Sequence, residues 1–134
     1  MIVGVIGAGQ MGAGIAQVSA GAGHTVLLSD IDLARAEAGK AGIGKALGRL
    51  VAKDKMTQGD ADALHARITP VTDHSAFKPA DLVIEAATER EDIKRAIFAS
   101  VGPHLSATAI LASNTSSIPI TRLAQASPDP ARFI

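Results

Sequence analysis

The feature that most constrains this chain is a glycine-rich turn directly after a short apolar run. Residues 2–6 read Ile-Val-Gly-Val-Ile, and Gly7-Ala8-Gly9-Gln10-Met11-Gly12 follows without a break. An apolar run of this length predicts a strand of a parallel sheet, and the stretch after the turn has helical spacing. In that context Gly7 makes the tight turn, Gly9 admits a pyrophosphate and Gly12 lets the helix pack against the strand. We therefore expect residues 7–12 to bind a dinucleotide; a glycine turn without a ligand is the alternative.

Asp30 follows the second apolar run, Thr25–Ser29, about 20 residues after the turn. A carboxylate in this place accepts hydrogen bonds from the hydroxyls of an adenosine ribose and repels a 2′-phosphate. No lysine or arginine precedes Arg35, so a 2′-phosphate lacks a partner. The pattern favours NAD over NADP. A role of Asp30 as a helix cap is the alternative, but Asp32 is better placed to cap the next helix.

Composition excludes several other classes of protein. The 13 basic and 13 acidic residues of the 134-residue chain cancel, so no overall positive field attracts nucleic acid or an anionic membrane. The chain has no cysteine, and its three aromatic residues are all phenylalanine, which excludes thiolate sites and stacking platforms for nucleic-acid bases. The histidines lack ligand spacing, so we expect no metal site. No membrane span or secretory signal is recognisable, and we expect a cytoplasmic location.

Apolar runs alternate with stretches of helical spacing throughout residues 1–134, which predicts one α/β domain with a doubly wound parallel sheet. Further strands are expected at residues 67–71, 82–84 and 109–112. Helices are expected at residues 9–20, 32–53, 57–66 and 120–125, and another is expected with Ile93, Ile97 and Val101 on one face. Thr57 is expected to cap the helix at 57–66. The residues expected to be buried by the first two helices are Met11, Ile15 and Val18, and then Ala34, Ala38, Ala41, Leu47 and Val51. Residues 132–134 look like the first half of another strand.

Polar residues follow the strands expected at 82–84 and 109–112. Because ligands of a doubly wound sheet lie beyond such strand ends, Glu89 is a candidate contact of the nicotinamide ribose, with Lys94 as its neighbouring cation. The alternative is an ordinary solvated helix start, preceded by the capping-box spacing of Thr88 and Glu91. The hydroxyls of residues 113–117 either hold a carbonyl group or cap the next helix.

The four histidines, at positions 24, 65, 74 and 104, are expected on the surface. None of them follows a strand end at the predicted cleft. The sequence therefore offers no general base paired with a carboxylate.

Taken together, these segments resemble the (S)-3-hydroxyacyl-CoA dehydrogenases, including the short-chain 3-hydroxybutyryl-CoA dehydrogenases. The matching stretches are Val-Ile-Gly-Ala-Gly-Gln-Met-Gly-Ala-Gly-Ile-Ala at 5–16, Asp30, Asp-Leu-Val-Ile-Glu-Ala at 81–86, and Ile-Leu-Ala-Ser-Asn-Thr-Ser-Ser-Ile-Pro-Ile-Thr at 110–121. The last stretch is the most specific, and the resemblance covers the whole chain. It implies a Rossmann NAD-binding domain of an enzyme that oxidises the 3-hydroxyl of an acyl-CoA by hydride transfer to NAD.

The resemblance also implies roles for single residues. Ser116 corresponds to the serine near the substrate oxygen and the nicotinamide, which makes it the catalytic candidate and a contact of both substrate and cofactor. Lys53 corresponds to a basic position that touches a CoA phosphate, although a solvated helix end explains it equally well. The implied cofactor-binding residues are Gly7, Ala8, Gly9, Gln10, Met11, Gly12, Asp30, Glu89, Lys94 and Ser116.

The chain also departs from this family. The family's catalytic histidine, held by a glutamate, lies a few residues beyond the position that corresponds to Ile134, and the all-helical second domain that closes the cleft and forms the homodimer is missing. We therefore expect residues 1–134 to be a truncated cofactor domain with little turnover of its own. Two alternatives are a stand-alone NAD-binding sensor or subunit and a sister NAD-linked hydroxyacid dehydrogenase.

Overall fold

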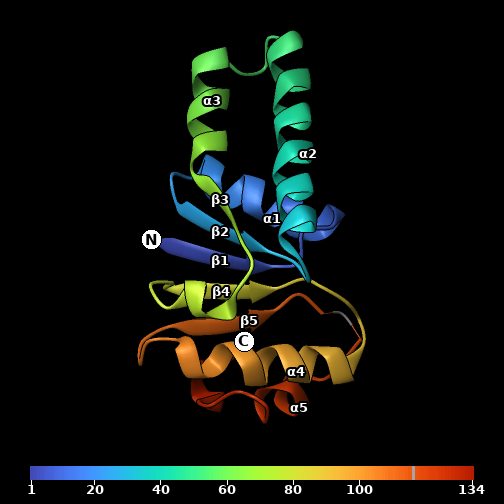
Figure 1. Ribbon diagram of the computed structural model, residues 1–134, viewed down its shortest axis with the longest axis vertical. Helices are drawn as coiled ribbons and strands as arrows, with labels where there is room; N and C mark the ends of the chain where they lie inside the picture. Colours follow the sequence, from blue (N-terminus) through green and yellow to red (C-terminus); the bar gives the residue numbers. More distant parts are fainter. Residues whose placement is uncertain (116) are drawn as a thin grey trace.

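A parallel five-stranded sheet runs through the centre of the computed structural model, which describes residues 1–115 and 117–134. Its strands are β1 (Ile2–Ile6), β2 (Thr25–Ser29), β3 (Ile68–Val71), β4 (Leu82–Glu85) and β5 (Ile110–Ser113). The order β3-β2-β1-β4-β5 means that the chain moves outward from β1 and then returns to its other side (Figure 1). Ligands of such sheets bind where the direction switches, beyond the carboxyl ends of β1 and β4. The predicted doubly wound α/β domain is confirmed.

The helices pack around the sheet. They are α1 (Gln10–Gly21), α2 (Leu33–Ala52), α3 (Gln58–Ala66), α4 (Glu91–Val101) and α5 (Ile120–Ala124). In Figure 1, α2 and α3 run side by side and project beyond β3, while α4 and α5 lie at the β5 end. Within the part of the chain that the structure describes, no helix is long and apolar enough to cross a membrane.

Two of the predicted helix caps are confirmed and one is wrong. The backbone N–H of Arg35 donates to the Asp32 carboxylate at 2.8 Å, which caps α2. Asp60 N–H donates to the Thr57 hydroxyl at 3.1 Å and caps α3 in the same way. The capping box predicted before α4 does not form, because Thr88 accepts a hydrogen bond from Arg90 N–H, inside the loop.

The apolar core is divided by the sheet into two clusters. Along β1, Val3 and Val5 face the cluster formed with α1, α2 and α3, while Ile6 faces the cluster formed with α4 and α5. Gly4 also faces the second cluster, where a Cβ on it would lie 2.5 Å from the Phe77 ring. The alternation of side chains along a strand therefore sends neighbouring residues of β1 to opposite cores.

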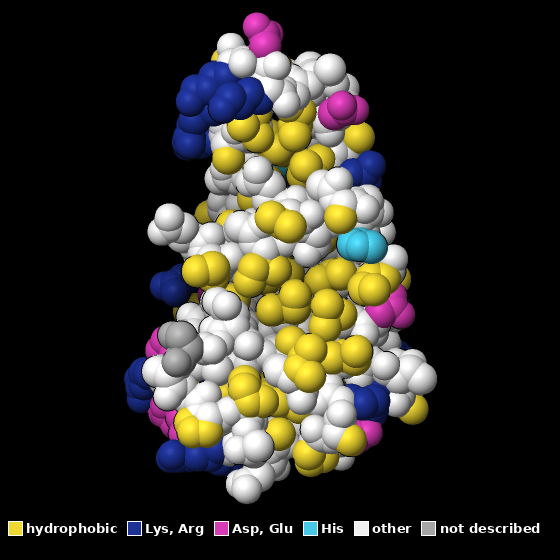
Figure 2. Space-filling view, turned by 180° about the vertical axis from the view of Figure 1, so that it is seen from behind, with side chains coloured by type: hydrophobic (Ala, Val, Ile, Leu, Met, Phe, Trp, Pro, Cys, Tyr) yellow, Lys and Arg dark blue, Asp and Glu magenta, His cyan; other side chains and the backbone are white. Residues whose placement is uncertain are grey.

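The predicted buried face of α1 is wrong for Met11 and Val18, while Ile15 is partly buried against the first cluster. Met11 is 59% exposed and Val18 is 75% exposed, whereas the buried residues of α1 are Gly12, Ala16 and Ala20. The helix packs so closely against the sheet that only small residues fit at the contact. From the side opposite to Figure 1, hydrophobic side chains gather across the middle of the molecule (Figure 2).

The predicted stripe of α2 is wrong for its three alanines, whereas Leu47 is buried and Val51 is partly buried against the first cluster. The helix buries Ala36, Gly39, Ile43 and Leu47 and exposes Ala34, Ala38 and Ala41. The helix α2 passes close to the glycine turn, since a Cβ on Gly39 would lie 2.8 Å from the Ala8 side chain. This close contact determines which face of α2 is turned toward the core. Alanine occurs all around α2, so composition alone carries little information about its buried face.

The last residues extend the sheet as the sequence predicts. Phe133 forms an isolated parallel bridge with Leu111. The backbone N–H of Ile134 donates to Leu111 O, and that of Ser113 donates to Ile134 O, both at 2.9 Å. Residues 133–134 therefore lie beside β5 as the beginning of a further strand.

Candidate functional site

The glycine turn joins β1 to α1 in a conformation that requires glycine at two positions. Gly7 has a φ of 111°, in the region that L side chains rarely adopt, and a Cβ on it would lie 2.7 Å from Ala86 O. A Cβ on Gly12 would overlap the carbonyl oxygen of Gly7. The turn is therefore folded back on the first turn of α1, and the start of the loop after β4 closes it from the other side.

The N-terminus of α1 is open to a ligand. Gly9 is its N-cap residue and provides no side-chain cap, and the first turn contains no acidic residue. A Cβ on Gly9 would meet nothing within 4 Å. Unpaired N–H groups and the positive end of the helix dipole favour an anion here. Gly9 therefore leaves room for an anionic group rather than for another part of the chain.

Asp30 ties the end of β2 to this turn. Its carboxylate accepts hydrogen bonds from Ala8 N–H at 2.8 Å and from Ile31 N–H at 2.7 Å. The side chain is only half-buried and borders two cavities. Asp30 thus stabilises the turn and still presents carboxylate to a neighbouring ligand.

The first of these cavities opens between the ends of β2 and β4 and has a volume of about 720 Å³. Asp30 and Ile31 border it on the β2 side, and Ala87 and Thr88 on the β4 side. His74, after β3, lies in its wall as well. The expectation that every histidine lies away from the cleft is therefore wrong for His74. We call this space the Asp30 cavity.

A separate cavity, of about 410 Å³, adjoins the Asp30 cavity at Ala87 and Thr88, which line both. Met11 borders it from α1, Glu89 from the loop after β4, and Asn114 from the loop after β5. Glu89 Oε2 accepts hydrogen bonds from the hydroxyls of Thr115 at 3.0 Å and Ser117 at 2.5 Å. The predicted site residues on both loops are thus brought together. We call this space the Glu89 cavity.

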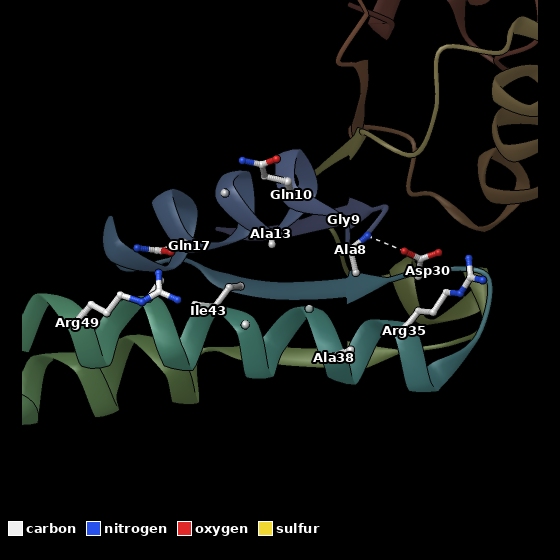
Figure 3. Close-up of a pocket in the computed structure, with 14 residues that line it drawn as sticks. Ala8, Gly9, Gln10, Ala13, Gln17, Asp30, Arg35, Ala38, Ile43 and Arg49 are labelled. Atoms are coloured by element: carbon white, nitrogen blue, oxygen red, sulfur yellow. Dashed lines mark hydrogen bonds between the residues drawn. The ribbon is translucent and has the colours of Figure 1, made fainter.

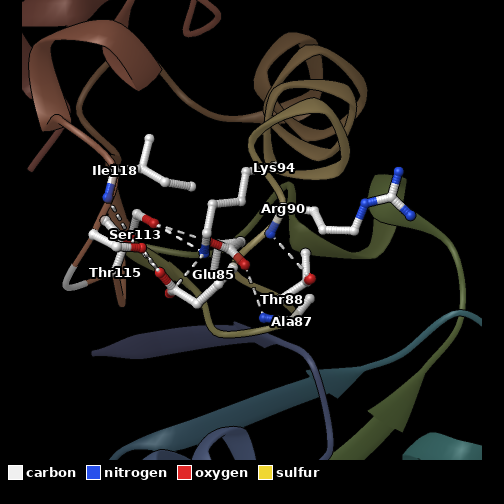
Figure 4. A network of polar contacts seen from close by, with 10 residues as sticks. Glu85, Ala87, Thr88, Arg90, Lys94, Ser113, Thr115 and Ile118 are labelled. Atoms are coloured by element: carbon white, nitrogen blue, oxygen red, sulfur yellow. Dashed lines mark hydrogen bonds and ion pairs between the residues drawn. The ribbon is translucent and has the colours of Figure 1, made fainter.

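Lys94 lies behind the Glu89 cavity and is fully buried. Its ammonium is 2.5 Å from Glu85 Oε1 and 4.0 Å from Glu89 Oε1 (Figure 4). The sequence placed Lys94 beside Glu89, which the structure confirms, but it did not predict the ion pair of Lys94 with Glu85. The structure also shows Ser113 in this network, since its hydroxyl donates to Glu85 at 2.8 Å.

A third hollow is a groove between α1 and α2, with a volume of about 720 Å³. Arg35 and Arg49 of α2 stand at its two ends, with Gly9 near Arg35 and Gln17 near Arg49 (Figure 3). Much of its lining consists of alanine and glycine, so an extended chain can lie close to the backbone there. Lys53, the predicted CoA-phosphate contact, is exposed at the end of α2, beyond Arg49, and borders none of the three hollows. We call this hollow the α1–α2 groove.

Two further predictions concern Ser116 and the absence of a metal site. Ser116, the predicted catalytic and substrate-binding residue, lies outside the described residues. Among residues 1–115 and 117–134, no group of three or more His, Asp or Glu side chains is arranged to hold a metal ion.

His74 predicts a pH dependence of stability. Burial lowers the pKa of its imidazole below the usual 6.5, and nearby His104 acts in the same direction, while Asp73 opposes both. His74 also shares a 2.7 Å hydrogen bond with the Ser100 hydroxyl. Because the unfolded chain takes up the proton first, the stability that His74 contributes is complete above pH 6.5 and is lost as the pH falls through the lowered pKa.

Urea unfolding at about pH 7.5 and about pH 5.5 tests this expectation. The free energy of unfolding should be smaller at the lower pH, and the difference should shrink in His74→Gln. An unchanged difference in the variant would assign the pH dependence to other groups. A backbone hydrogen bond from Ser75 holds the pKa of Asp73 below 3.8, and a hydrogen bond from Arg132 does the same for the pKa of Asp129. These two carboxyl groups therefore change the stability only at more acidic pH.

Comparison with known proteins gives the family of the chain. Residues 2–134 match the model of the family described as "3-hydroxyacyl-CoA dehydrogenase, NAD binding domain". A probable 3-hydroxybutyryl-CoA dehydrogenase of Deinococcus radiodurans is 48% identical over 134 residues, which are 100% of this chain and 48% of that protein. A 3-hydroxybutyryl-CoA dehydrogenase of Bradyrhizobium diazoefficiens is 47% identical over 98% of this chain and 45% of its own length.

Solved structures agree with this result. The crystal structure of (S)-3-hydroxybutyryl-CoA dehydrogenase from Ralstonia eutropha superimposes with a TM-score of 0.96 and 43% identity, over 99% of this chain and 47% of that one. The chain therefore spans about half the length of the relatives that it matches. On these grounds, the chain belongs to the family of the NAD-binding domain of 3-hydroxyacyl-CoA dehydrogenases.

Proposed function

We propose that this chain forms the cofactor half of an NAD-dependent dehydrogenase that converts short-chain (S)-3-hydroxyacyl-CoA to 3-oxoacyl-CoA. The observation that carries the proposal is the open N-terminus of α1, with Asp30 on one side and Glu89 on the other. An anion-binding helix end between two cavities fits a molecule with two nucleoside halves joined by a pyrophosphate. Several of the relatives are named 3-hydroxybutyryl-CoA dehydrogenases, which supports the substrate class.

The residues present fit NAD in both halves. The Asp30 cavity would take the adenosine, with the carboxylate on the ribose hydroxyls, and the backbone of residues 7–12 would hold the pyrophosphate. The Glu89 cavity would take the nicotinamide riboside, with Glu89 on the second ribose and Met11 beside it. When bound, NAD accepts the hydride that leaves the 3-carbon of the substrate. Lys94 would act here through Glu89, because its own side chain is buried.

The CoA portion of the substrate fits the α1–α2 groove. Arg35 and Arg49 provide positive charge along it, and Lys53 adds another near the end of α2, which suits the phosphates of CoA. Ser116 is proposed to donate a hydrogen bond to the substrate oxygen near the nicotinamide. The proton of the 3-hydroxyl needs a base, and we assign it to the histidine–glutamate pair of a following helical domain, by resemblance to the family.

An assay of the natural polypeptide and of residues 1–134 tests the proposal. With 3-hydroxybutyryl-CoA, the natural polypeptide should form NADH, while residues 1–134 should bind NAD and give less than a few per cent of that rate. A missing general base alone reduces the rate about 10²–10⁴-fold. NADH formation from free hydroxyacids but not from their CoA esters would favour a sister dehydrogenase. Binding of NAD without any turnover by the natural polypeptide would favour a sensor or subunit.

The proposal also covers the oligomeric state and the location of the natural polypeptide. We propose that it is a homodimer held together by its helical domain, and that it works in the cytoplasm. Light scattering of the natural polypeptide beside residues 1–134 tests the first, since only the longer chain should dimerise. Cell fractionation tests the second.

A further inference from the structure

A fully buried carboxylate, Glu85, is the centre of a polar network at the end of β4. Its Oε1 accepts hydrogen bonds from the Lys94 ammonium at 2.5 Å and from the Ser113 hydroxyl at 2.8 Å. Its Oε2 accepts one from Ala87 N–H at 2.8 Å. Glu85 thus joins α4, β5 and the loop after β4. The loop after β4 and the loop that follows β5 both border the Glu89 cavity.

Stability alone is a weak reason for such a pair. Both Glu85 and Lys94 are 0% exposed, and removing two charges from water costs several kcal/mol per ion. Apolar side chains of the same volume often replace a buried ion pair without loss of stability. The position of the pair, directly behind a cavity wall, suggests a different role.

The charges continue from the buried pair to the surface of the cavity. Lys94 Nζ lies 4.0 Å from Glu89 Oε1, and Glu89 is 51% exposed at the wall. The other oxygen of Glu89 is held by the hydroxyls of Thr115 and Ser117. One ammonium therefore lies near two carboxylates, of which one is buried in the core and the other lines the Glu89 cavity.

We propose that Glu85 is a positioning residue for the nicotinamide-riboside end of the cofactor. It fixes the Lys94 ammonium, and Lys94 in turn fixes the orientation of the Glu89 carboxylate. The Ser113 hydroxyl links the Glu85 carboxylate to β5. The loop that contributes Asn114 and Thr115 is therefore held in a fixed position relative to the loop after β4. The proposal rests on the assignment of the Glu89 cavity to the nicotinamide half. Glu85 itself touches no ligand.

The matched ligands NADH and ADP test this role. ADP contains the adenosine and both phosphates but lacks the second ribose and the nicotinamide. In Glu85→Gln, NADH affinity should fall about tenfold, the value of one hydrogen bond to a charged group, while ADP affinity should change less than about twofold. Glu91→Gln is the control, because Glu91 pairs with Arg95 and Arg122 at the surface and should leave both affinities unchanged.

The double variant Glu85→Gln/Lys94→Met separates positioning from folding. It removes both buried charges, so thermal stability should recover most of what Glu85→Gln loses, and it serves as the measured protein if the single variant does not fold. NADH affinity should stay low in the double variant with ADP affinity intact. Recovery of NADH affinity together with stability would overturn the proposal, and so would a parallel loss of both ligands. A wild-type chain that binds neither ligand would instead contradict the proposed function.

Discussion

Replacing Gly12 by alanine is expected to lower the free energy of unfolding by about 3 kcal/mol or more. The new methyl group would overlap the carbonyl oxygen of Gly7. That oxygen belongs to a backbone held on both sides, since Gly7 N–H donates to Ser29 O at 2.8 Å and Ala86 closes the turn from the loop after β4. No side chain can rotate away to relieve the overlap, so α1 has to shift along the sheet. Urea unfolding of the two proteins measures the loss.

Gly14→Ala is the matched control for this prediction. Gly14 lies on the same helix two residues later and is exposed, and a Cβ there would meet nothing within 4 Å. Helix propensity alone then applies, and the control should gain up to about 1 kcal/mol of stability. Equal behaviour of the two variants would show that the close approach of Gly12 to Gly7 does not constrain the turn. NAD titration should show weakened binding only for Gly12→Ala, because its helix end is displaced.

Replacing Asp30 by asparagine is expected to weaken NAD binding about 10–100-fold, the value of charged hydrogen bonds to the ribose hydroxyls. The side chain keeps its shape and an oxygen that can accept from Ala8 N–H, so the turn should persist. Removing the negative charge also removes the repulsion of a 2′-phosphate. The preference for NAD over NADP should therefore shrink, which calorimetric titration with both cofactors measures.

Asp32→Asn is the control for this second prediction. Asp32 is two residues away and exposed, and its cap of α2 is one that asparagine makes equally well. The control should leave the affinities for both cofactors unchanged. If Asp30→Asn lowered NAD and NADP affinity by the same factor, the contact between Asp30 and the ribose would be wrong, and the role of Asp30 would be limited to holding the turn.

Features encoded within a few neighbouring residues could be predicted from the sequence. The β1–turn–α1 unit follows from five apolar residues and three spaced glycines, and the caps at Asp32 and Thr57 follow from their distance to the next helix. The bounds of β2 are also as predicted. In each case the determining contacts join residues close in the chain, so spacing alone describes them.

Features that depend on packing between distant segments could not be predicted in the same way. Glu85 reads as the last residue of an apolar strand, and only the folded sheet brings it to Ser113 on β5 and Lys94 on α4. His74 follows an unremarkable strand, yet β3 carries it to the Asp30 cavity. For α1, the large residues Met11 and Val18 dominated the hydrophobic pattern, while the contact with the sheet required the smallest ones.

The position of β1 has a consequence for how the domain opens. It pairs with β2 on one side and β4 on the other, and its residues are shared between both apolar clusters. Neither layer of helices can detach without exposing part of the same strand, so the two layers should be lost in a single cooperative event. Amide protons of Val3 and Val5 should then exchange with solvent only through global unfolding, at the slowest rate in the molecule. The turn that begins at Gly7 is thus anchored to the least mobile segment of the chain.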